Sequence, residues 1–134
     1  MLSDYERRLL LRFAEAQVGD RAALEAQLQS AVVTGESPGF LNLAIAEDAP
    51  RIVDQMGYPI EGWYNDVDDS IVTLILHIDA GAQIVSRLER FRPDGEPIIE
   101  RSPSPATVKI QAEVLDGPGQ AATFDREHGW KRYR

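Results

Sequence analysis

Apolar side chains follow a helical spacing at the start of the chain. Tyr5, Leu9 and Phe13 recur every four residues, directly after a Ser3-Asp-Tyr-Glu6 segment that has the form of a capping box. A second helix is predicted over residues 21–29, where apolar positions again recur at helical spacing. The two segments predict an N-terminal helical hairpin.

From residue 31 onward the spacing changes to that of strands. The most apolar run, residues 71–78, is interrupted only by Thr73 and His77, which predicts a strand buried on both faces. Alternating or β-branched residues predict further strands at 31–34, 41–45, 60–64, 83–92 and 108–114. This order predicts an α+β fold, in which an N-terminal helical hairpin packs on one face of a mainly antiparallel five- to six-stranded sheet.

The length of 134 residues suits one domain, which we place at residues 1–115. Residues 116–134 have few apolar positions and are predicted to form a flexible C-terminal tail. This tail interleaves basic residues with Trp130 and Tyr133, a pattern that suits nucleic acid. The acidic charge of the whole chain argues against direct nucleic-acid binding. Residues 107–114 could form an exposed edge strand and pair with a second copy, so both a monomer and a homodimer are open.

The absence of cysteine excludes disulfides and thiol chemistry. The N-terminus has no basic segment followed by an apolar one, and the longest apolar run is too short to cross a membrane. These features predict a cytoplasmic protein that does not enter a membrane.

The net charge of −8 is unevenly distributed along the chain. Residues 36–69 contain eight acidic residues and one basic residue. Such a field repels phosphates and attracts a basic partner, although acidic residues can also serve solubility alone.

Candidate chemistry is sparse. Asp66, Asp68 and Ser70 imitate the start of a calcium loop, but Ile71 and His77 occupy the positions where that loop needs glycine and glutamate. His77 invites a catalytic interpretation, yet a structural histidine paired with a group such as Asp79 is favoured. No phosphate-cradling glycine loop or nucleophile motif is present. We therefore predict no enzyme activity, catalytic residue, metal site or cofactor.

A partner-binding site is the best use of the remaining features, because aromatic residues bordered by charge are typical of protein interfaces. Trp63 and Tyr64 are adjacent in a predicted strand, so their side chains should point to opposite faces. The candidate partner-binding residues are Glu61, Trp63, Tyr64, Asp66, Asp68 and Asp69.

Several short segments carry a family resemblance: Leu2–Leu10, Leu24–Leu28 with Ala31–Val33, Pro59–Tyr64, Leu74–His77 and Leu88–Ile98. In this layout the chain resembles a group of small uncharacterised bacterial α+β proteins that includes candidate immunity proteins of polymorphic toxin systems. The resemblance implies neutralisation of a toxin by binding, and it supplies no catalytic residues.

Three functional hypotheses follow. The first is a non-enzymatic immunity protein that occludes the active site of a basic toxin. The second is an acidic nucleic-acid mimic that inhibits a nuclease or another defence enzyme, which requires acids spread over one continuous surface. The third is a small-ligand protein or enzyme that uses His77, which requires a concave pocket beside that residue.

Overall fold

The computed structural model describes residues 2–15, 20–55, 60–115, 121–125 and 129–133. The helices are α1 (Asp4–Ala14), α2 (Arg21–Ser30) and the short 3-10 helix η1 (Pro105–Thr107). The strands are β1 (Val32–Glu36), β2 (Phe40–Ala44), β3 (Ile60–Asn65), β4 (Ile71–Asp79), β5 (Ile84–Phe91), β6 (Lys109–Leu115), β7 (Ala121–Asp125) and β8 (Gly129–Tyr133).

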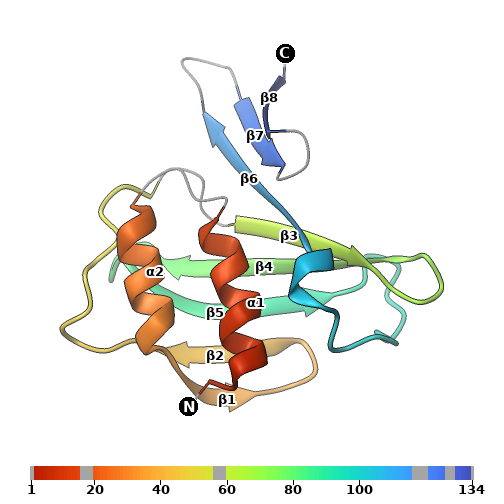
Figure 1. Cartoon of the computed structure of the whole chain (residues 1–134), viewed down its shortest axis with the longest axis horizontal. Coiled ribbons are helices and arrows are strands. Elements are labelled where there is room, and N and C mark those ends of the chain that lie inside the picture. The colour runs from red at the N-terminus through yellow and green to blue at the C-terminus, as the bar shows by residue number, and fades with distance from the viewer. Residues whose placement is uncertain (1, 16–19, 56–59, 116–120, 126–128, 134) are drawn as a thin grey trace.

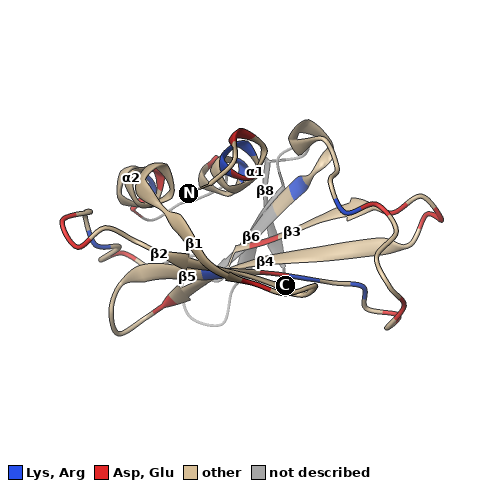
Figure 2. Ribbon diagram, turned by 90° about the horizontal axis from the view of Figure 1, so that it is seen from below, with Lys and Arg blue, Asp and Glu red and all other residues tan. Residues whose placement is uncertain are grey.

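All of these strands join one antiparallel sheet in the order β1-β2-β5-β4-β3-β6-β7-β8 (Figure 1). Helices α1 and α2 lie side by side on one face of the sheet, and Figure 2 shows no helix on the opposite face among the described elements. The predicted α+β fold is confirmed. We call the face without helices the open face.

Two of the strands lie in the segment that the sequence predicts to be a tail. The backbones of residues 121–125 and 129–133 pair as β7 and β8, and β7 continues the sheet from β6. Strand pairing uses backbone groups, so it needs fewer apolar side chains than the prediction assumed. Because β6 lies between β3 and β7, the predicted edge strand at residues 107–114 is wrong. The flexibility of the segment stays a prediction.

Helix α1 begins as its sequence predicts. The Ser3 hydroxyl accepts a hydrogen bond from the Glu6 amide at 3.0 Å, and the Ser3 amide donates to the Glu6 carboxylate at 2.8 Å. Leu9 and Phe13 are buried against the sheet. The capping box and the apolar stripe therefore fix both where the helix starts and which side it turns inward.

Helix α1 is also tied to a segment that lies far away in the sequence. The buried Arg12 guanidinium donates from Nε to the Pro105 carbonyl at 2.8 Å and from Nη2 to the Val108 carbonyl. In the first turn of the same helix, the Tyr5 hydroxyl donates to the Pro103 carbonyl at 2.7 Å. Residues 103–108 thus form the main polar anchor of this helix.

The central strand β4 differs between its two faces. Val72, Leu74 and Leu76 point toward the helices and are fully buried, whereas Ile71 on the open face is 50% exposed. The prediction that this strand is buried on both faces is therefore correct only for the helix-covered face. Among the elements that the structure describes, no second layer of helices covers the open face.

Glycine at position 62 lets three elements approach one another. A Cβ atom at this position would lie 2.9 Å from the Lys109 carbonyl oxygen, 3.0 Å from a methyl group of Ile110 and 3.5 Å from the Phe13 ring. The first contact is with backbone, which cannot rotate away as a flexible side chain can. The close packing of β3 against β6 and α1 therefore depends on Gly62.

We expect Gly62→Ala to lower the free energy of unfolding by about 1–3 kcal/mol, because the added methyl group forces β3 and β6 apart. Urea denaturation measures the change. Gly39→Ala is the matched control, since its Cβ would meet its nearest neighbour at an ordinary 3.7 Å. Equal stability of the two variants would contradict the role assigned to Gly62.

Candidate functional site

Arg92 organises the end of the sheet at which β3 and β5 finish. Its side chain is only 3% exposed, and its guanidinium contacts the carboxylates of Asp66 at 3.1 Å, Asp68 at 3.0 Å and Asp94 at 2.5 Å. Two further acids, Asp69 and Glu96, are exposed beside this cluster. We call these five acids around Arg92 the acidic end; they lie in the acidic loops at one side of Figure 2.

Asp66 is the most enclosed member of the acidic end, with a fully buried side chain. Its carboxylate accepts hydrogen bonds from the backbone amides of Val67 at 2.9 Å, Ile99 at 2.9 Å and Glu100 at 2.7 Å. Burial raises the pKa of this carboxyl, but the backbone amides and Arg92 outweigh that effect and lower the pKa to about 2. Asp66 therefore holds the fold together and is not available to a partner.

The other acids at this end keep part of their surface in solvent. The backbone amide of Ser70 and the Arg92 guanidinium lower the pKa of Asp68, while hydrogen bonds from Arg92 and then from the Glu96 amide lower that of Asp94. Asp69 is exposed in a turn with a positive φ of 66°. Asp68, Asp69 and Asp94 can therefore present negative charge to a partner.

An aromatic patch lies on the open face next to the acidic end. Trp63 of β3 and Phe91 of β5 flank Thr73 of β4 as cross-strand neighbours. Thr73 is only 7% exposed although no helix among the described elements covers this face, as expected for a small residue between two large cross-strand neighbours. We define the aromatic patch as Trp63, Ile71, Thr73 and Phe91; Ile71 is 50% exposed and Phe91 37% exposed.

The predicted partner-binding residues are divided between the surface and the interior. Glu61 and Trp63 lie on the open face, and Asp68 and Asp69 lie at the acidic end. Asp66, as described above, is interior. Trp63 and Tyr64 were predicted to point to opposite faces of the sheet. This prediction is confirmed, because Trp63 lies on the open face and Tyr64 points inward.

That inward neighbour is Tyr64, which is buried. Its hydroxyl donates to the Glu100 carbonyl at 2.5 Å, and burial raises its pKa to about 12. Tyr64 and Asp66 are thus structural residues, a placement that sequence reasoning missed. Sequence reasoning also missed Ile71 and Phe91 as members of the aromatic patch. The alternation of side chains along β4 could have placed Ile71 on the same face as Thr73.

His77 lies on the open face and is paired with Glu89 of β5, with 2.8 Å between His77 Nε2 and the carboxylate. The predicted partner Asp79 instead accepts from the amides of Gly81 and Ala82 at the β4–β5 turn. His77 lines neither the pocket beside the first turns of α1 nor the pocket between the last turns of α1 and η1. A paired histidine on a sheet surface accounts for the residue.

Most acids of residues 36–69 lie at two separate ends of the sheet. Asp68 and Asp69 belong to the acidic end, whereas Glu47, Asp48 and Asp54 lie in the loop between β2 and β3. That loop is held near the β4–β5 turn, where the Ile52 amide donates to the Gln83 carbonyl at 2.9 Å. Figure 1 shows the two acidic loops at opposite sides of the molecule.

Within the described ranges, no three His, Asp or Glu side chains are arranged to hold a metal ion. In the same part of the chain, no helix has the length and apolar character needed to cross a membrane. Comparison with family models, curated proteins and solved structures gave no match. The family resemblance seen in the sequence therefore stays a prediction.

Proposed function

We propose that this chain is a non-enzymatic protein-binding module, and most concretely an immunity protein that neutralises a basic toxin by covering its active site. The observation that carries the proposal is the aromatic patch bordered by the acidic end. The sequence resemblance points the same way.

The aromatic patch has the chemistry of an interface centre. Trp63 and Phe91 are large, rigid side chains, and residues of this kind supply much of the binding energy in protein complexes. Ile71, two residues from Thr73 along β4, adds an exposed aliphatic side chain to the patch. Burial of this patch by a partner would remove apolar surface from water, which favours association.

The acidic end has the chemistry of an interface rim. Arg92 neutralises only part of the charge of its five acidic neighbours, so a negative field remains beside the patch. Such a field accelerates encounter with a basic surface and weakens as salt increases. A toxin whose active site binds phosphates would offer that basic surface.

Placement of the acids favours this proposal over mimicry of a nucleic acid. A mimic needs carboxylates along one continuous surface, whereas the acids of residues 36–69 lie mainly at two ends of the sheet. The pairing of His77 with Glu89 likewise gives no support to an enzyme built around that histidine.

The test begins with capture of a partner from host lysate and continues with affinity measurements on the identified protein. We expect Phe91→Ser to weaken binding by about tenfold or more, because it removes an apolar anchor. Glu96→Lys should slow association and reduce its dependence on salt. Co-expression with a toxin partner should show loss of protection by the same variants.

Two matched controls make the test specific. Val53→Ser changes a side chain that is 71% exposed and lies away from the patch, and Asp48→Lys reverses an acid at the other end of the sheet. Both should leave affinity unchanged. If the controls weaken binding as much as Phe91→Ser and Glu96→Lys do, the interface lies elsewhere, and competition with DNA or RNA would favour the mimic.

A further inference from the structure

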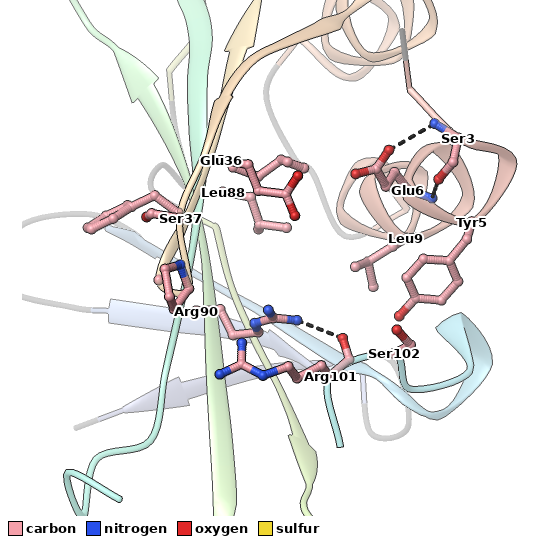
Figure 3. Close-up of a pocket in the computed structure, with 14 residues that line it drawn as sticks. Ser3, Tyr5, Glu6, Leu9, Glu36, Ser37, Leu88, Arg90, Arg101 and Ser102 are labelled. Carbon is pink, nitrogen blue, oxygen red and sulfur yellow. Dashed lines mark hydrogen bonds between the residues drawn. The ribbon is translucent and has the colours of Figure 1, made fainter. Parts of the chain in front are cut away.

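A cleft lies on the helix-covered side of the sheet, away from the aromatic patch. It is bounded by the first turns of α1, the β1–β2 hairpin, β5 and residues 101–102, and its volume is about 690 Å³ (Figure 3). This volume is in the range of small-molecule sites. Neither the fold nor the proposed protein interface accounts for it.

The cleft has an apolar side. Leu9 of α1, Leu41 of β2 and Leu88 of β5 line it, and the last two are cross-strand neighbours. Leu9 and Leu88 are largely buried, so they are held in place by the core behind them. A ligand with a short apolar group would find a preformed contact surface here.

The cleft also has a cationic wall made by Arg90 and Arg101. The Arg90 guanidinium donates from Nη1 to the Arg101 carbonyl at 2.6 Å, which places it beside residue 101. Figure 3 shows both guanidinium groups on the same wall. Within the part of the chain that the structure describes, neither guanidinium forms an ion pair with a carboxylate.

Two neighbouring like charges that form no ion pair with a carboxylate repel each other, and an anion bound between them relieves that repulsion. Arginine forks also match the geometry of carboxylate and phosphate oxygens. The hydroxyl groups of Ser37 and Ser102 line the same cleft and can donate further hydrogen bonds.

Two carboxylates limit which anions fit. The Glu6 side chain accepts the Ser3 amide in the capping box, so part of its charge is already bound. The side chain of Glu36, on the β1 side of the cleft, forms no ion pair or hydrogen bond with other described residues. Its charge disfavours a ligand that is anionic along its whole length and favours one with a single anionic group.

We propose that this cleft binds a small organic anion, whose carboxylate or phosphate group is held by Arg90 and Arg101 and whose apolar group lies against Leu9, Leu41 and Leu88. This ligand class is independent of the protein partner proposed above.

Hexanoate and hexyl phosphate are suitable probes, measured by calorimetry and by amide shifts in NMR spectra of the full chain. We expect saturable binding of at least one probe, with shifts at residues 36–41 and 101–102. The tighter of the two identifies the anionic group. Hexanol lacks the charge and inorganic phosphate lacks the apolar group, so both should bind more weakly than the tighter probe.

Three variants test the residues. Arg101→Gln and Arg90→Gln should each weaken binding by about tenfold, and Glu36→Gln should strengthen it by removing a like charge. Arg21→Gln, on the exposed surface of α2, is the matched control and should bind as wild type does. The Arg101 side chain forms no hydrogen bond or ion pair with other described residues, so the Arg101→Gln variant should fold normally. Thermal unfolding checks this.

Two results would overturn the proposal. One is wild-type affinity weaker than about 1 mM for both charged probes. The other is a folded Arg101→Gln variant that binds the probe as tightly as Arg21→Gln does.

Discussion

Replacement of Asp66 by asparagine is expected to lower the melting temperature by about 10 °C or more. Aspartate and asparagine are almost the same size, so the loss of stability must come from the change in charge and hydrogen bonding. One carboxylate oxygen becomes an NH2 group, which must face either the Ile99 amide or the Glu100 amide, and buried Arg92 loses a counterion. Circular dichroism during heating at neutral pH measures the shift.

Asp69→Asn is the matched control for this prediction. It makes the same chemical change three residues later, at an exposed position whose positive φ asparagine tolerates. Its melting temperature should stay close to that of wild type. Similar shifts in the two variants would show that Asp66 stabilises the fold no more than a solvent-exposed acid does.

The Asp66 carboxylate should also make the stability of the fold depend on pH in the acidic range. Because the folded state lowers the Asp66 pKa from 3.8 to about 2, the stabilisation is fully present above pH 3.8 and is lost as the pH falls toward 2. Asp68 and Asp94 shift in the same direction. Denaturation between pH 5 and 2 should therefore be less pH-dependent in Asp66→Asn than in wild type.

Replacement of Gln27 by leucine should cost about 3 kcal/mol or more of unfolding free energy. Gln27 is fully buried on α2, and its amide makes three hydrogen bonds to backbone. Nε2 donates to the carbonyls of Pro50 at 2.7 Å and Gln83 at 3.1 Å, and Oε1 accepts from the Val85 amide at 2.9 Å. Leucine fills similar space but leaves all three backbone groups without this partner.

Gln29→Leu serves as the control, because it introduces the same residue two positions later on the exposed side of α2. Urea denaturation of both variants separates the hydrogen-bond loss from any change in helix propensity. If Gln27→Leu were as stable as Gln29→Leu, the apolar gain of leucine would have to compensate for the loss of three hydrogen bonds.

Local patterns allowed the secondary structure to be predicted well. The Ser3 capping box is a short-range signal, as is the adjacent pair at positions 63 and 64, and both predictions are confirmed. The burial of the helix-covered face of β4 was also predicted correctly from the apolar run. Such features depend on residues within a few positions of one another, so the sequence alone contains the information.

The roles of Asp66 and Gln27 could not be predicted in this way. A carboxylate in an acidic turn looks the same in sequence whether it faces water or the amides of residues 99 and 100. A glutamine on a helix likewise gives no sign that backbone from residues 50, 83 and 85 surrounds it. Both roles depend on long-range contacts, and these also decided which candidate site residues remain on the surface.

The anchoring of α1 by residues 103–108 has a consequence during synthesis on the ribosome. The helix is made first, yet its polar partners are made roughly a hundred residues later. At about 5–20 residues per second, the nascent helix waits about 5–20 s for them. Throughout that interval its apolar stripe has no complete docking surface and is accessible to chaperones. The first helix to be translated is therefore among the last elements to reach its native packing.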